Sequence, residues 1–182
     1  MKIALFTVII LTIVCSFTAC KEPEKGPEES STAATTASSV ISAPQAFVPA
    51  ENGFVFEYDG TRVVLGTAAD AVISALGEPR SVFESPSCAF EGIDKTFFYN
   101  DFYIQTFPWE NEDYISVVHF QTDGVGTVEG LYIGMDAGDM FRLYGEVYTK
   151  DLGMYTFTKN GAELAVLVED GEIVQITYYL IQ

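Results

Sequence analysis

The sequence has few basic residues. Its 182 residues include 9 Lys and Arg against 26 Asp and Glu, which gives a formal net charge of -17 at pH 7. Nucleic acid and anionic membrane surfaces repel such a chain, so we exclude both as partners. The acidity has two interpretations, a well-solvated surface or a site for basic ligands or cations, and the sequence leaves both open.

Cysteine and histidine are also scarce, which limits the chemistry. The chain has 3 Cys and 1 His. If Cys15 leaves with a leader and Cys20 carries lipid, Cys88 is the only thiol of the mature chain and no intramolecular disulfide can form. We expect Cys88 to be a small buried residue. With so few groups to build an activated nucleophile, we expect no catalytic residue, no cofactor and no enzyme.

The candidates for metal binding are weak. His119 is expected in the core or at a sheet edge, where it finds too few other ligands. Glu110, Glu112 and Asp113 cluster at 110–113. Calcium needs six or more oxygens at defined positions, so a solvated acidic turn is the better interpretation of this cluster. Hydrolysis by carboxylates alone stays open as an alternative.

The first 50 residues have the composition of a leader and a tether. Lys2, an apolar run at 3–14 and small residues after it are typical of a signal peptide at 1–19. Residues 17–20, Phe-Thr-Ala-Cys, resemble the bacterial lipobox, which implies a lipid on Cys20. A cleaved secretory leader or an uncleaved anchor is the alternative. Residues 20–50, rich in Lys, Glu, Pro, Ser and Thr, predict a disordered tether that precedes a domain at 51–182.

One sequence unit occurs twice in this domain. Residues 63–77 align without a gap on residues 131–145, at an offset of 68, and predict repeats at about 54–122 and 123–182. In each unit an apolar strand end meets a glycine and a short helix follows. Thr67 and Asp136 are the predicted N-caps, with Asp70 and Asp139 in the first turns. The last residue of each unit is a glycine that should end the helix in the left-handed conformation.

The strand pattern predicts an α+β fold, with the helices on one face of an antiparallel sheet. Hairpin turns are expected at 59–60, 100–101, 160–161 and 170–171, where Asn, Asp and Gly separate runs of β-forming residues. Each repeat then consists of a short helix and a three-stranded meander. Residues 80–96 show no clear period and are interpreted as mostly loop, and residues 125–133 as a strand.

These patterns carry a family resemblance. The Ile-x-x-Gly or Leu-Gly before a short helix, and the meander after it, resemble the tandem repeat of the β-lactamase-inhibitor-protein-like fold and small lipoproteins of outer-membrane assembly. The motifs at 87–90, 98–102, 127–130 and 133–134 resemble a group of uncharacterised lipoproteins of Firmicutes. The resemblance spans 51–182 and implies a binding module without catalytic residues. The inhibitor's disulfide loops are missing, and the lipid anchor is an addition.

Strand alternation identifies a candidate binding face. In the last strand, Val174, Ile176, Tyr178 and Leu180 are expected to face the helices, and Ile173, Gln175, Thr177 and Tyr179 to face outward. Transferred to the first half, this register places the following residues inward: Phe102, Ile104, Ile115, Val117 and His119. The predicted partner-binding residues are the aromatic side chains around the outward face: Phe98, Tyr103, Phe107, Trp109, Tyr114, Phe120 and Tyr179. The alternative is that the 80–96 loop or the tether covers this face.

Together these features predict a lipid-anchored, extracytoplasmic module at the cell membrane that binds a protein or glycan of the cell envelope. A structural component of an envelope complex is the first alternative, and a carboxylate-based hydrolase is the second.

Overall fold

The computed structural model describes residues 48–181. The predicted signal peptide, Cys20 and nearly all of the predicted tether lie outside the described residues. The end of that tether is already part of the fold, because Ala50 is 3% exposed and its N–H donates to the Leu65 carbonyl. In the described part of the chain no helix is long and apolar enough to cross a membrane.

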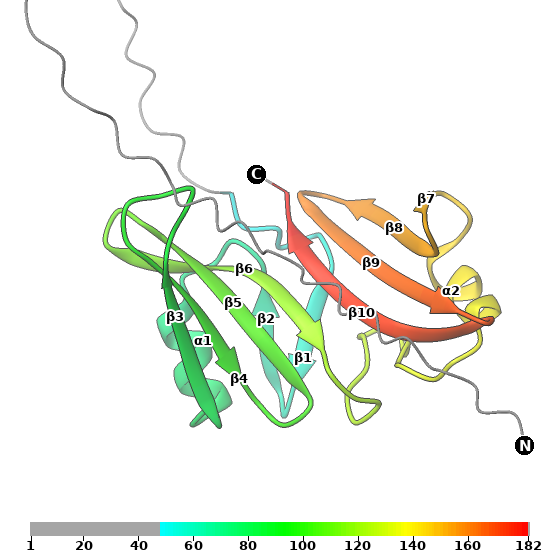
Figure 1. Ribbon diagram of the computed structural model, residues 1–182, viewed down its shortest axis with the longest axis horizontal. Coiled ribbons are helices and arrows are strands. Elements are labelled where there is room, and N and C mark those ends of the chain that lie inside the picture. The colour runs from blue at the N-terminus through cyan, green and yellow to red at the C-terminus, as the bar shows by residue number, and fades with distance from the viewer. Residues whose placement is uncertain (1–47, 182) are drawn as a thin grey trace, which may run out of the picture. The chain divides into compact units, whose positions relative to one another are not determined.

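The described residues form mostly antiparallel β-sheet with two short helices (Figure 1). The elements before residue 122 are β1 (Val55–Tyr58), β2 (Thr61–Val64), α1 (Ala69–Leu76), β3 (Ser81–Pro86), β4 (Ile93–Phe98), β5 (Phe102–Trp109) and β6 (Glu112–Phe120). The elements after it are α2 (Ala137–Tyr144), β7 (Thr149–Asp151), β8 (Met154–Lys159), β9 (Ala162–Glu169) and β10 (Glu172–Leu180).

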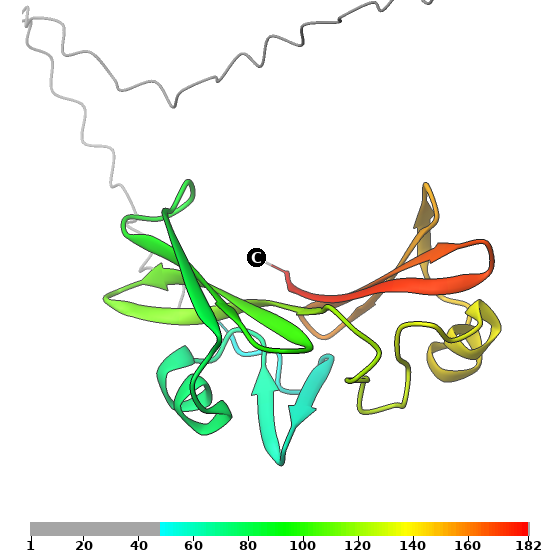
Figure 2. The same cartoon turned by 60° about the horizontal axis from the view of Figure 1, so that its bottom comes forward.

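Eight of the strands form one sheet, in the order β3-β4-β5-β6-β10-β9-β8-β7, and β1 pairs with β2 separately. Strands β6 and β10 are therefore neighbours at the middle of the sheet, as Figure 2 also shows. Each half contributes a four-stranded meander, so the predicted three-stranded meander is wrong. The edge strands β3 and β7 are the missed elements, and every residue of β7 is exposed. A strand with little burial shows no alternation from which to predict it.

The predicted hairpin turns are confirmed. Asp59-Gly60, Asn160-Gly161 and Asp170-Gly171 all have positive φ at both residues, the type I′ geometry that favours Asn or Asp before Gly. The stretch at 125–133 is not a strand. It is a loop that Thr127 closes by accepting, through its hydroxyl, the Leu131 N–H at 3.0 Å. Between β5 and β6 the turn is confined to Glu110 and Asn111, and Asp113 lies in β6.

The same backbone contacts join the segment before each helix to the sheet. Before α1, the Gly66 N–H donates to the Ile115 carbonyl at 2.7 Å, and the Ile115 N–H donates to the Thr67 carbonyl at 3.0 Å. Before α2, the Gly134 N–H donates to the Ile173 carbonyl at 2.8 Å, and the Ile173 N–H donates to the Met135 carbonyl at 2.9 Å. Each helix is thus attached to the strand that lies at the middle of the sheet.

Each of these central strands has a β-bulge immediately after the contact. In β6 the pairing passes from Ile115 to Val117 and leaves Ser116 as the extra residue. In β10 it passes from Ile173 to Gln175 and leaves Val174 as the extra residue. An extra residue inverts the alternation of every side chain beyond it.

The bulges correct the predicted faces. We call the face whose side chains enter the hydrophobic core the inner face, and the opposite one the outer face. Phe120 and Ile173, predicted outward, are 1% and 0% exposed in the core, so that prediction is wrong. Val117, His119 and Val174, predicted inward, alternate with buried neighbours and lie on the outer face. The inward predictions for Phe102, Ile104, Ile115, Ile176 and Tyr178 are confirmed.

The two helices begin differently and end alike. At α2, the Asp136 carboxylate accepts the Gly138 N–H at 2.7 Å, so the predicted cap is confirmed. At α1 the N-cap is Ala68, which has no side-chain bond, and the Thr67 hydroxyl instead donates to the Val64 carbonyl. Gly77 and Gly145 end the helices at φ 84, ψ -169 and φ 80, ψ -168. This is an extended region open only to glycine, and not the left-handed helical region that we predicted.

Candidate functional site

One row of paired residues crosses the outer face from edge to edge. We call it the central row, and in strand order it consists of Ser81, Phe98, Tyr103, His119, Thr177, Ala165, Thr156 and Thr149. Its rings all lie in the first half of the domain. The second half of the row carries only small side chains.

The rings of the central row contact one another in sequence, the first pair tilted and the second stacked. The Phe98 and Tyr103 rings lie 5.4 Å apart, and the Tyr103 and His119 rings lie 4.6 Å apart with 20° between their planes. His119 Nδ1 lies 2.8 Å from the Thr177 Oγ1, which also accepts a bond from Gln175. The rings are therefore held in place by one another and by the β6–β10 junction.

The central row is uncharged at neutral pH. Burial lowers the pKa of His119 below its usual 6.5. Burial also raises the pKa of Tyr103, with a smaller contribution from Tyr179. The row therefore offers ring faces and hydroxyl groups to a ligand, and no net charge.

A hollow of about 350 Å³ lies beside the aromatic half of the row. Its lining includes Phe98 and Tyr103, and also Phe83, whose side chain is 61% exposed at the sheet edge. Thr96 and Gln105 add polar groups from β4 and β5. Tyr179 is 39% exposed and pairs with Val117 on the same face. This hollow and the aromatic residues beside it form a candidate ligand surface on the outer face.

A second aromatic group lies at the β5–β6 turn. Phe107, predicted to be open, is 5% exposed because Phe90 of the loop before β4 stacks on it at 5.0 Å. Phe90 also meets Trp109 at 5.5 Å, and Phe107 lies 5.9 Å from Tyr114. The 80–96 segment therefore covers this end of the outer face, as our alternative interpretation required.

The predicted site residues thus fall into three sets. Phe98 and Tyr103 are brought together on the central row, with Tyr179 one row away. Phe107, Trp109 and Tyr114 form the second group. Phe120 belongs to the hydrophobic core and is therefore not part of the candidate site. The residues that we missed are Phe83 and Phe90, in the stretch interpreted as loop, where Val82 and Phe83 were a β-forming signal too short to decide the assignment.

The residues considered for chemistry are dispersed. Cys88 is exposed, so its predicted burial is wrong. Within 48–181 no group of three or more His, Cys, Asp and Glu side chains could hold a metal ion. In the acidic turn, Asp113 pairs with Lys95 at 2.6 Å, and Glu112 accepts the Tyr114 hydroxyl at 3.1 Å. The Asp113 and Glu112 carboxylates therefore bind neighbouring side chains of the sheet.

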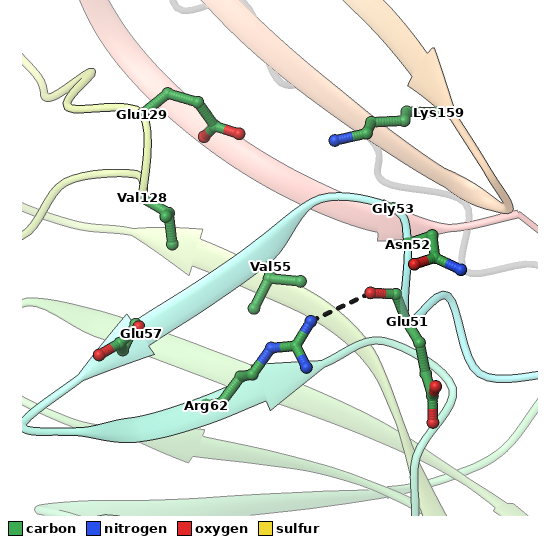
Figure 3. A pocket seen from close by; sticks show the side chains of 9 residues that line it. All are labelled: Glu51, Asn52, Gly53, Val55, Glu57, Arg62, Val128, Glu129 and Lys159. Carbon is green, nitrogen blue, oxygen red and sulfur yellow. Dashed lines mark hydrogen bonds between the residues drawn. The ribbon is translucent and has the colours of Figure 1, made fainter.

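Another hollow, of about 320 Å³, lies beside the β1–β2 hairpin (Figure 3). It is lined by charges of both signs: Glu51, Glu57, Glu129, Arg62 and Lys159. Arg62 donates to the Glu51 carbonyl at 3.1 Å. The three carboxylates come from separate segments and point in different directions in Figure 3, so they form no acid–base pair.

No family model, curated protein or solved structure matches this chain.

Proposed function

We propose that this chain is a lipid-anchored, extracytoplasmic binding module that presents its outer face to a protein or glycan of the cell envelope. The observation that carries the proposal is the aromatic half of the central row, where the Phe98, Tyr103 and His119 rings contact one another beside an open hollow. Partly exposed rings on a rigid sheet offer large contact areas at low entropic cost, and aromatic residues dominate interface energies.

We also propose that the domain is a tandem repeat with the helices on one face of the sheet, as in the β-lactamase-inhibitor-protein-like fold and the Firmicutes lipoproteins. Several observations support this. The two helices start and end 68 residues apart, the same backbone contacts precede both, and both central strands carry a bulge at the matching place. Figure 2 draws both helices on the same side of the sheet.

The binding function can be tested through two exposed aromatic residues of the outer face, Phe83 in the lining of the hollow and Tyr179 on β10. The double variant Phe83→Ser and Tyr179→Ser should lose the envelope partner, while its stability changes little because both side chains are exposed. The matched control is Tyr132→Ser with Val147→Ser, which are 47% and 91% exposed and lie away from the hollow. The measurement is recovery of the partner by the full-length chain after cross-linking in cells. Equal recovery by both double variants would contradict the proposal.

The anchor can be tested separately. Cys20→Ala should release the chain from membranes or leave it unprocessed, because stable anchoring depends on acyl chains. Unchanged fractionation with normal processing would contradict a lipid at this position.

The first alternative, a structural component of an envelope complex, predicts that cross-linking traps the chain in one stoichiometric assembly. Recovery as a monomer would exclude that role. The second alternative, a hydrolase using only carboxylates, has weaker support, because the carboxylates of the β1–β2 hollow diverge (Figure 3).

A further inference from the structure

A separate hollow, at the β5–β6 turn, has the chemistry of a cation site. It measures about 260 Å³ and is lined by Phe90, Glu91, Pro108, Trp109 and Glu110. The Phe90 and Trp109 rings stand at 87° to each other, so they form two walls of a corner. Among the described residues that line it, two are charged, Glu91 and Glu110, and both are exposed.

The corner is preformed. Ser87 Oγ accepts the Ala89 and Phe90 N–H groups at 3.4 and 3.3 Å, and the Ser87 N–H donates to the Gly92 carbonyl at 3.0 Å. Gly92 lies so close to β5 that a Cβ there would be 2.9 Å from the Pro108 ring. The loop that carries Phe90 is thus packed tightly on the strand end that carries Trp109.

We propose that this hollow binds an alkylammonium group, and a quaternary one better than a primary one. The faces of Phe and Trp rings attract cations, and two carboxylates at the same hollow add to the attraction. N-methyl groups can pack against the rings and Pro108. A primary ammonium is strongly hydrated and loses more on leaving water. This site does not depend on the central row, so either proposal can fail without the other.

Trp109 serves as the fluorescent reporter of binding, because the sequence contains 1 Trp and this residue lines the hollow. The full-length chain, in a non-ionic detergent at constant ionic strength, is titrated with choline while the Trp fluorescence is recorded. The neutral control is 3,3-dimethylbutan-1-ol, which has the same shape without the charge. A third titration uses N-acetyl-lysine amide. We expect a saturable change with choline, with Kd in about the millimolar range, and a weaker response to the other two compounds.

Charge-removing variants test whether the cation binds in the hollow. Glu91→Gln with Glu110→Gln should raise the Kd for choline by about tenfold, because two close carboxylates are lost. Glu78→Gln with Glu169→Gln removes the same charge from exposed positions elsewhere and should leave the Kd unchanged. The proposal is overturned if choline gives no saturable change, if the neutral alcohol responds equally, or if both double variants weaken binding alike. Tighter binding of the lysine amide than of choline would overturn the preference for a quaternary group.

Discussion

The two halves of the domain share an inner face and differ on the outer one. On the inner face, matching positions carry apolar side chains in both halves: Phe97 and Tyr155, Phe102 and Leu164, Ile104 and Val166, Val118 and Ile176, Phe120 and Tyr178. On the outer face, Phe98 and Tyr103 match Thr156 and Ala165. At the edge, Phe83 matches Asp151.

The difference indicates which constraints act on each face. The inner positions must fill one core, so both halves keep large apolar groups there. The outer positions carry no such requirement, and only the first half uses them for rings. We therefore propose that both halves provide the scaffold and that the first half provides the binding surface.

The largest effects are expected on the inner face, and they should be similar in the two halves. Phe120→Ala and Tyr178→Ala each remove a side chain that is 1% exposed. Each should lower the free energy of unfolding by about 3–5 kcal/mol. Tyr179→Ala, on the outer face, should cost less than about 1 kcal/mol. Urea unfolding at pH 7 measures all three, and an equal cost for Tyr179 would mean that the outer face is part of the core.

The glycines that end the helices should also respond alike. Gly77→Val and Gly145→Val force a β-branched residue into a glycine-only conformation, which costs roughly 1–3 kcal/mol each. A Cβ at either position meets no atom within 4 Å, so the cost comes from the backbone alone. The controls Glu78→Val and Glu146→Val place the same residue one position along. If the glycine variants melt like their controls, the two helix ends are not equivalent stops.

The helix starts offer a smaller, asymmetric test. Asp136→Ala should destabilise the fold by about 1 kcal/mol, because it removes the side-chain capping bond of α2, which has no counterpart at α1. Ala68→Asp should stabilise it by about 0.5–1 kcal/mol, since Ala68 has the extended φ and ψ of a cap residue. Thermal unfolding of both variants measures the difference. Destabilisation by Ala68→Asp would show that the two helix starts differ in more than the capping side chain.

The smallest effect is the pH dependence that His119 gives to stability. Its pKa is lowered by burial, so the unfolded chain binds a proton more readily than the folded one. This contribution is complete above the unfolded pKa of 6.5 and is lost as the pH falls toward the lower folded pKa. We expect His119→Gln to flatten the stability profile in that window. An unchanged slope between pH 7 and 5 would mean that His119 is not desolvated on the outer face.

The sequence predicted the features that depend on local chemistry. The Asp59-Gly60, Asn160-Gly161 and Asp170-Gly171 pairs form type I′ turns between runs of β-forming residues, whereas Asn52-Gly53 and Asp123-Gly124 do not have positive φ. The glycines at 77 and 145 end helices because their backbone conformation is open only to glycine. The cap at Asp136 could be predicted because a short acidic side chain before a helix accepts a bond from a backbone N–H two residues later. The α+β class and the approximate positions of eight strands, all except β3 and β7, were predicted from the turn signals and the runs of β-forming residues between them.

What could not be predicted depends on contacts between distant segments. Ser116 and Val174 are ordinary β-strand residues, and nothing in them signals a bulge. Once each bulge is passed, the faces invert, so His119 and Phe120 exchanged their predicted sides. The burial of Phe107 likewise depends on Phe90, 17 positions earlier in the chain.

The most direct test of the account compares matching edge positions in the two halves. A photo-cross-linking phenylalanine analogue is placed at position 83 in one strain and at position 151 in another, both exposed edge-strand sites on the outer face. Irradiation of cells should yield a covalent adduct from position 83 and none from position 151. Equal adducts from both positions, or an adduct from position 151 alone, would contradict a binding surface confined to the first half.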